Sequence, residues 1–145
     1  MNIAFRKFNG AQDWAWVNNL VGILQVQDTT GIMAYDAKTG ETLGACIMDN
    51  WTANSVQCHL AISTPMVFRH KFLEECCTFI FKSMGKLVMY GLVPSNNQKA
   101  IKLNTHMGFT EAHRLKDAFS DGVDYIIMEL RAENCRFIAL GAQRP

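Results

Sequence analysis

The side chain best suited to moving a proton near neutral pH is a histidine in a mainly apolar run. His59 lies between Cys58 and Leu60 in a segment, 56–63, that we expect to be a strand. Because side chains alternate along a strand, His59 lies on the opposite face from both neighbours. Imidazole titrates nearest to neutrality of all side chains, so His59 is a candidate general base, with a hydrogen-bonded structural histidine as the alternative. Weaker candidates are carboxylates expected on strand ends or turns, where they are commonly solvated: Glu111, Asp117 and Asp121.

Three consecutive side chains that can carry positive charge follow this strand, in the segment 64–71. They are Arg69, His70 and Lys71, and they stand where we expect a helix to begin. Positive charges at that end of a helix oppose its dipole, whereas an anion is attracted both by the free N–H groups and by the cations. The run therefore indicates a polyanion site, and a solvated basic turn is the alternative.

The cysteine pattern indicates buried, reduced thiols. An odd number cannot all pair within one chain, no C-x-x-C occurs, and the histidines show no zinc-ligand spacing with the cysteines. We therefore expect no metal site and a cytoplasmic protein. The cysteines are Cys46, Cys58, Cys76, Cys77 and Cys135.

Short alternating or apolar runs predict the strands that must position these residues. They cover 1–8, 31–36, 41–51, 56–63, 87–93, 109–119 and 123–130. Periodicity of three to four residues predicts helices over 10–24, over 67–84 and between 95 and 108. The last helix follows an S-x-x-Q capping box from Ser95 to Gln98.

The predicted order is β–α–β–β–β–α–β–α–β–β. Short turns make most neighbouring strands antiparallel, but the helix between 56–63 and 87–93 is a crossover that makes this pair parallel. We expect an α+β fold with one mixed, mostly antiparallel sheet covered by helices, in a single domain over residues 1–145.

Charge and hydropathy exclude several classes of partner. The 145 residues carry 14 basic and 13 acidic side chains, for a formal net charge of +1. This balance gives no electrostatic drive toward nucleic acid or an anionic membrane, and we expect to find neither as a partner. No apolar run approaches the roughly 18–20 residues of a membrane helix, and no secretory signal is evident at the start.

The segment Val93–Phe109, V-P-S-N-N-Q-K-A-I-K-L-N-T-H-M-G-F, carries a family resemblance. It is similar to a motif of the GNAT N-acetyltransferase superfamily, in which a strand ends and N-x-x-A-(I/V)-x-L-Y-x-x-x-G-F begins the next helix. Six positions fall in register: Asn97, Ala100, Ile101, Leu103, Gly108 and Phe109. The resemblance covers roughly residues 3–131, agrees with the predicted element order, and extends to small bacteriophage and bacterial proteins, so the host cytoplasm is the location if a phage encodes the chain.

The resemblance implies helices on both faces of the sheet and a parallel strand pair that splays apart to bind acetyl-CoA or another acyl-CoA. It also implies acyl transfer to an amine by direct attack, without a covalent enzyme intermediate. The backbone of Ile62 and Thr64 would hold the acyl–pantetheine arm, and His59 would lie near the acceptor. The remaining implied contacts are Phe68, Arg69, His70, Lys71 and Phe72 for the pyrophosphate, Asn97 for the pantetheine region and Asn104 near the thioester.

Two departures from the family pattern bear on catalysis. The chain has no glycine between Gly44 and Gly85, although the family's loop after the strand is glycine-rich so that the backbone can approach phosphate. Asn104 stands where the family usually has a tyrosine that protonates the leaving thiolate, and an amide cannot act as that acid. Slower catalysis, with Asn104 only orienting the thioester, is the expectation.

These departures leave two other functions open. One is a GNAT-fold binding module with weak or no catalysis that docks on a host or regulatory protein, and the other is a CoA sensor. Trp16 and Trp51 are candidates for an acceptor site or a protein interface, whereas Trp14 belongs to a core-facing stripe. The amine acceptor is a small molecule or a protein, and a homodimer is compatible with the resemblance.

Overall fold

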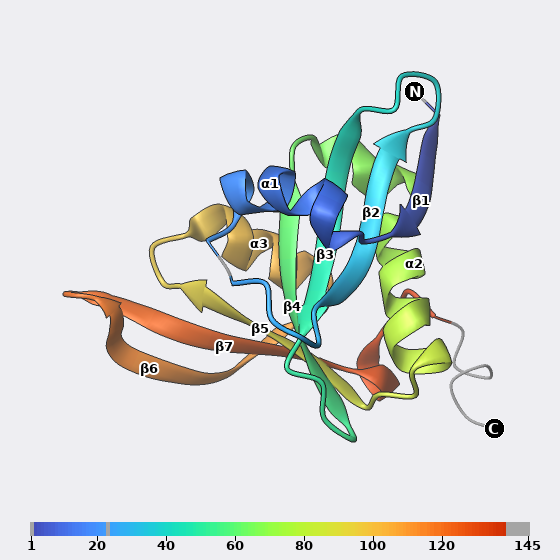
Figure 1. Cartoon of the computed structure of the whole chain (residues 1–145). Helices are drawn as coiled ribbons and strands as arrows, with labels where there is room; N and C mark the ends of the chain where they lie inside the picture. The colour runs from blue at the N-terminus through green and yellow to red at the C-terminus, as the bar shows by residue number, and fades with distance from the viewer. Residues whose placement is uncertain (1, 23, 139–145) are drawn as a thin grey trace.

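The structure, a computed structural model, describes residues 2–22 and 24–138, with the backbone alone at positions 69 and 70. Its described strands form a single sheet in the order β1-β2-β3-β4-β5-β7-β6 (Figure 1). Among them only β4 and β5 run parallel, as predicted. The strands are β1 (Ile3–Lys7), β2 (Thr30–Asp36), β3 (Thr42–Asp49), β4 (Ser55–Ile62), β5 (Val88–Pro94), β6 (Thr110–Ser120) and β7 (Val123–Arg131). The predicted element order and fold class are confirmed.

The helices are shorter and more broken than the sequence pattern predicts. The helix expected over 67–84 is a 3-10 turn at Pro65–His70, the helix α2 (Phe72–Cys77) and a π-helical stretch at Thr78–Ser83. The break falls at Lys71, whose φ of 68° is left-handed and cannot continue a right-handed helix. The helix α1 (Gly10–Leu20) also ends earlier than expected, because Val21 is already extended.

The third helix, α3 (Gln98–His106), begins two residues later than the capping box predicts. Its cap is Asn97, whose side-chain Oδ1 accepts from the Ala100 N–H at 3.1 Å. Ser95 lies in the turn after β5 instead, and its hydroxyl oxygen accepts from the Asp124 N–H at 2.8 Å. The prediction was wrong because β5 continues through Pro94, which leaves Ser95 to join the strand to β7.

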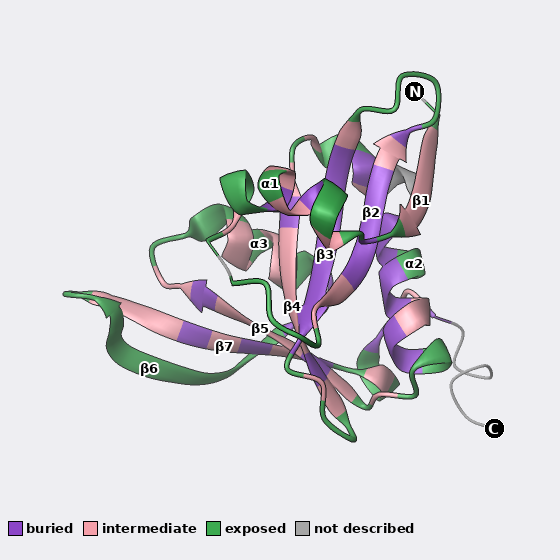
Figure 2. Cartoon of the chain, viewed as in Figure 1, coloured by how far each residue is buried: buried purple, intermediate pink, exposed green. Residues whose placement is uncertain are grey.

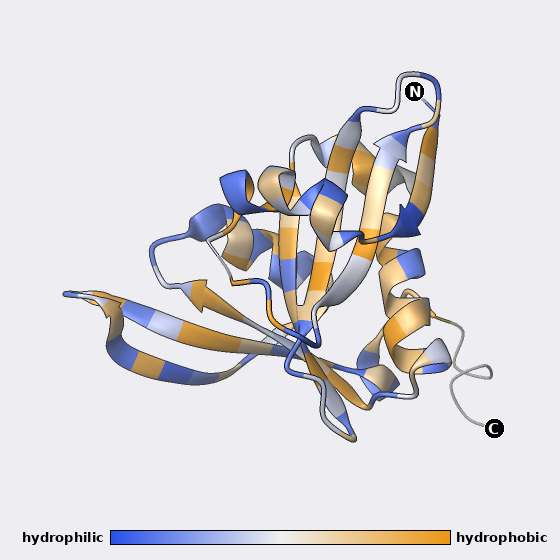
Figure 3. Ribbon diagram, in the orientation of Figure 1, coloured by the Kyte–Doolittle hydropathy of each residue, from blue (hydrophilic) through white to orange (hydrophobic). Residues whose placement is uncertain are grey.

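Helices cover both faces of the sheet, as the family resemblance implied. Val17 of α1 packs with buried side chains of β2, β3 and β4 on one face, while α2, the π-helical stretch and α3 pack on the other. The central strand β3 is buried from Leu43 onward (Figure 2), and hydrophobic residues are concentrated in the same central strands (Figure 3). None of the described helices has the length and apolarity needed to cross a bilayer.

Candidate functional site

The two parallel strands separate along most of their length. β4 and β5 pair only over Ser55–Gln57 and Val88–Tyr90. Beyond the Gln57–Tyr90 pair they diverge, while β3 stays paired with β4 as far as Ile62 and β7 stays paired with β5 as far as Pro94. The sheet therefore opens at one seam, which we call the wedge, and the predicted splay is present (Figure 1).

A glycine lies at the vertex of the wedge. A Cβ added to Gly91 would stand 3.2 Å from the main-chain oxygen of Cys58, which is tighter than an ordinary contact. The missing side chain lets the two backbones stay close immediately before they part. No sequence pattern marks Gly91, because its role depends on which strand lies beside β5.

His59 lies on β4 two residues beyond Gln57, the last residue that pairs with β5. Its ring Nε2 is 3.0 Å from Oδ1 and 3.2 Å from Oδ2 of Asp49, the last residue of β3. Asp49 is only 6% exposed, and the His59 side chain is 16% exposed. With Gln57 and Ala61, His59 faces the side of the sheet that α1 covers. Cys58 and Leu60 face the other side, as the alternation of the strand predicted.

Asp49 is a site residue that sequence reasoning missed. It pairs with Gln57 across β3 and β4, and Gln57 pairs with Tyr90 across β4 and β5. Burial, reinforced by the negative charge of Asp49, raises the pKa of Tyr90, so the phenol keeps its proton. Only the register of three strands brings these residues together, and a sequence pattern does not fix that register.

Asn104 lies on the other face of the sheet. Its Nδ2 is 3.8 Å from the sulfur of Met128, which pairs with Gly91 across β5 and β7. The amide is thus held behind the vertex of the wedge, on the face that α2 and α3 cover. His59 and Asn104 therefore flank the wedge from opposite sides.

The segment after β4 brings few free polar groups to the wedge. Thr64 caps the 3-10 turn by accepting from the Met66 N–H at 3.4 Å, and Lys71 is exposed at the start of α2. Phe72 is fully buried and stacks on Phe5, so its side chain belongs to the core. Phe68 is half-buried against the same core. The side chains of Arg69 and His70 lie outside the described residues.

The first turn of α2 opposes an anion. No described side chain caps this helix, which leaves its first N–H groups available, but Glu74 and Glu75 occupy the same turn. Acidic side chains stabilise that end of a helix but repel phosphate. Asn97, expected in the pantetheine region, commits its side-chain oxygen to capping α3.

The cysteines are free thiols, four of them buried and Cys58 half-buried, as expected. The main-chain oxygen of Cys58 lies at the vertex, and hydrogen bonding of its thiol with Cys46, together with burial, raises the pKa of Cys58 well above the usual range. The neutral thiol is a poor nucleophile. Elsewhere, hydrogen bonds from the Cys77 thiol and from the N–H groups of Phe137 and Ile138 lower the pKa of Cys135 to about 7.

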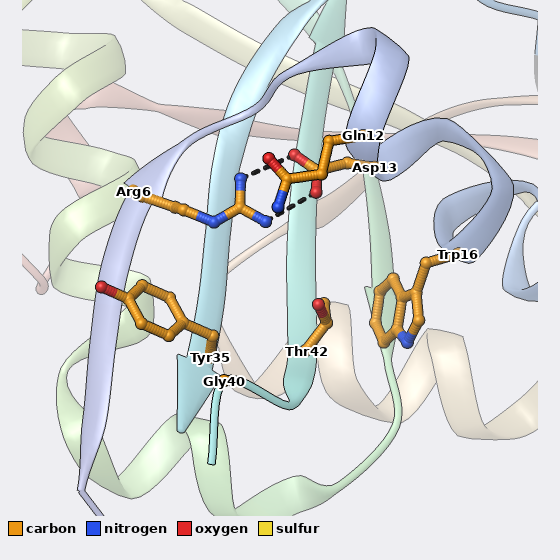
Figure 4. Close-up of a pocket in the computed structure, with 7 residues that line it drawn as sticks. All are labelled: Arg6, Gln12, Asp13, Trp16, Tyr35, Gly40 and Thr42. Atoms are coloured by element: carbon orange, nitrogen blue, oxygen red, sulfur yellow. Dashed lines mark hydrogen bonds and ion pairs between the residues drawn. The ribbon is translucent and has the colours of Figure 1, made fainter. Parts of the chain in front are cut away.

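A cavity of about 360 Å³ lies on the α1 side, over the edge of the sheet (Figure 4). Within it, Arg6 holds Asp13 in two hydrogen bonds of 2.6 and 2.8 Å, and Asp13 is 3% exposed. The pair already satisfies its charges, so it offers little to a charged ligand. The lining residues are Arg6, Gln12, Asp13, Trp16, Tyr35, Gly40 and Thr42.

The remaining sequence candidates lie away from the wedge, and most of them have structural partners. Trp51 packs edge-on against Phe79 with ring centres 6.3 Å apart and lies under the Lys86 ammonium. Three carboxylates lie on the β6–β7 hairpin, away from the wedge, where Glu111 pairs with Arg114, Asp117 accepts from the Gly122 N–H and Asp121 is exposed in the turn.

The chain resembles known proteins in structure but not in sequence. Neither a protein-family model nor a curated protein sequence matches the chain. The spermidine/spermine N-acetyltransferase SpeG of Vibrio cholerae, in complex with manganese ions, superposes with a TM-score of 0.75 at 15% identity, covering 91% of this chain and 94% of that one. A SpeG variant gives 0.76 at 15% identity, covering 97% and 98%, and a dodecameric form gives 0.74 at 15%, covering 91% and 95%. The chain therefore has the fold of the GNAT N-acetyltransferases, as its Val93–Phe109 motif indicated.

Proposed function

We propose that the chain is an acyl-CoA-dependent N-acyltransferase. The observation that carries the proposal is the wedge between β4 and β5, with His59 beside it on one face of the sheet and Asn104 behind it on the other. The fold shared with N-acetyltransferases supports the same activity. In the proposed reaction the acceptor amine attacks the acyl carbonyl directly, a C–N bond forms, and the C–S bond to CoA breaks.

The donor would lie in the wedge along the edge of β4 that β5 leaves unpaired. An extended acyl–pantetheine arm can use main-chain groups of Ile62 and Thr64 there, much as a strand would. For the pyrophosphate, the chain offers Lys71 and the positions of Arg69 and His70. The segment has no glycine that would let the backbone approach phosphate closely, and Glu74 and Glu75 repel phosphate. These cations would therefore supply most of the attraction. We expect weak binding of CoA, with a strong dependence on salt.

The acceptor would approach from the α1 side, where His59 takes a proton from its ammonium group. Asp49 is buried on that side, beside His59, whereas Glu129 of the same rung already pairs with Arg131 at 3.7 Å. A buried carboxylate beside the base favours a cationic acceptor. A polyamine is the class to test first, because the structural neighbours are spermidine N-acetyltransferases.

Asn104 would orient the donor without acting as an acid. An amide N–H can donate to the departing sulfur but has no proton to release near neutral pH. Water therefore has to protonate the thiolate, which is an acceptable leaving group. The expected consequence is a slower reaction than a tyrosine at this position would give.

The second candidate is a binding module that acts on a partner protein. The observation that favours it is the β6–β7 hairpin, which projects from the body of the molecule (Figure 1). All of β6 is exposed, including the apolar side chains of Leu115 and Phe119. Apolar residues on an exposed edge strand are typical of interaction surfaces.

Two measurements separate these functions. Calorimetry with CoA and acetyl-CoA tests the donor site, and mass spectrometry of a mixture of polyamines incubated with acetyl-CoA tests transfer. We expect binding in the micromolar to millimolar range, and acetylated amine that His59→Gln abolishes. Lys71→Ala should weaken binding of CoA, whereas Lys38→Ala, an exposed lysine in the β2–β3 turn, should not. No binding at millimolar ligand contradicts the enzyme and leaves the binding module.

A further inference from the structure

The contact between His59 and Asp49 fixes which ring nitrogen is engaged. Both carboxylate oxygens lie within hydrogen-bond distance of Nε2, at 3.0 and 3.2 Å. An ionised carboxylate only accepts hydrogen bonds, so Nε2 has to carry the proton. In the neutral ring this leaves Nδ1 with the free lone pair, on the side of the ring away from Asp49.

The residues around Asp49 leave its carboxylate free to hydrogen-bond to His59. Gln57 is the direct cross-strand neighbour of Asp49, but its side-chain oxygen accepts from Asn50 Nδ2 at 2.7 Å. Asn50 follows Asp49 with a left-handed φ of 52°, so the chain turns away as soon as β3 ends. The Asp49 carboxylate is thus held at the end of a buried strand, opposite the vertex of the wedge.

We propose that Asp49 is a positioning residue, which holds His59 as the Nε2–H tautomer so that Nδ1 takes the proton from the acceptor ammonium. This inference deepens the proposed acyltransferase function and rests on it. In the step, one ammonium N–H bond breaks, the Nδ1–H bond forms, and the amine keeps the electron pair with which it attacks the acyl carbon. The imidazolium produced has its positive charge beside the Asp49 carboxylate, which stabilises it.

The tautomer can be measured without any reaction. Two-bond proton–nitrogen correlation spectra of full-length protein with labelled histidine distinguish the Nε2–H tautomer from the Nδ1–H tautomer, and His59→Gln assigns the signal. At a pH where the ring is neutral, we expect His59 to be the Nε2–H tautomer. A predominant Nδ1–H tautomer in the unaltered protein would overturn the proposal.

Substitution then tests the role. In Asp49→Asn the amide can turn its NH2 group toward Nε2, so the tautomer should shift toward Nδ1–H. The value of kcat should fall by about 10²-fold, at the low end of what general-base catalysis contributes, with KM nearly unchanged. Asp36→Asn is the matched control, because Asp36 is also a buried aspartate at a strand end and its side chain accepts from the Lys38 N–H. It should leave both the His59 tautomer and kcat unchanged.

The outcomes separate this inference from the function on which it rests. An unaltered protein that binds acetyl-CoA but transfers nothing to any amine removes the proposed function, and with it this role for Asp49. An active protein whose Asp49→Asn variant keeps both its tautomer and its kcat removes the positioning role alone. Should Asp49→Asn not fold, Asp49→Glu, which keeps the charge but moves it, should also lower kcat with the fold intact, and full activity there contradicts the proposal.

Discussion

His59 and Asn104 lie on opposite faces of the sheet at the point where β4 and β5 separate. His59 is joined to Asp49 at 3.0 Å on the α1 side, and Asn104 contacts Met128 at 3.8 Å on the side of α2 and α3. A group passing through the wedge would therefore meet a base on one side and an amide donor on the other. This arrangement suits a thioester whose acyl carbon is attacked from one face while its sulfur departs toward the other.

Replacing His59 should abolish catalysis without affecting donor binding. In His59→Gln the side chain can still hydrogen-bond to Asp49 but cannot take a proton, so kcat should fall by about 10²- to 10⁴-fold. Steady-state kinetics together with calorimetry for CoA check this. A variant with unchanged kcat would show that another group, or bulk water, accepts the ammonium proton.

Restoring a phenol at position 104 should accelerate the reaction. A tyrosine hydroxyl can protonate the thiolate where the amide cannot, so Asn104→Tyr should raise kcat by up to about 10²-fold if departure of the thiolate limits the rate. The matched variant Asn104→Phe adds the ring without the hydroxyl and should not. Equal rates in the two variants would argue that the proton comes from elsewhere.

Closing the vertex of the wedge should cost both stability and activity. A Cβ at position 91 would meet the Cys58 oxygen at 3.2 Å, so Gly91→Ala should destabilise the fold by about 1–2 kcal/mol, within the usual range for overpacking. Gly22→Ala, where nothing lies within 4 Å, is the control. Urea unfolding and acetyl-CoA titration measure the two effects. Retained stability with retained binding would mean that the strands adjust freely at this point.

The ion pair of Arg6 and Asp13 should be a major local source of stability. Arg6→Ala would leave a buried carboxylate unpaired and should cost about 3 kcal/mol. Arg114→Ala, at an exposed ion pair on the hairpin, should change stability little. Equal small effects in urea unfolding would show that water reaches Asp13 once its partner is gone.

The ion pair of Arg6 and Asp13 should also make the stability of the fold depend on pH in the acidic range. Burial by itself favours the neutral acid, but hydrogen bonds from Arg6 and the Asn9 N–H hold the pKa of Asp13 below its ordinary value. A lowered folded-state pKa contributes stability that is fully present above the unfolded value and is lost as pH falls through the folded one. Stability should therefore fall as the pH drops below about 4, where an unfolded aspartate takes up its proton, and this part of the fall should disappear in Asp13→Asn. An unchanged acid profile in that variant would contradict the assignment.

Local sequence patterns predicted the fold, whereas several residues of the candidate site come together only through the register of the strands. Alternation and helical periodicity predicted each strand and the parallel pair, and the motif ending in Gly108 and Phe109 pointed to the shared fold. The helix break at Lys71 was not readable, because a left-handed lysine leaves no signature in apolar periodicity. Asp49 and Gly91 were missed because their roles arise from neighbours across the sheet.

The most direct test of the wedge is amide hydrogen exchange of the full chain with and without acetyl-CoA. Beyond Gln57 and Tyr90, β4 and β5 no longer pair with each other. In the absence of ligand, the amides of these stretches should exchange freely unless β3 or β7 hydrogen-bonds them. A donor lying between the strands should slow exchange at 58–62 and 91–94 and leave the hairpin unchanged. Protection confined to another region, such as the cavity near Arg6, with no change along these two segments, would contradict the account.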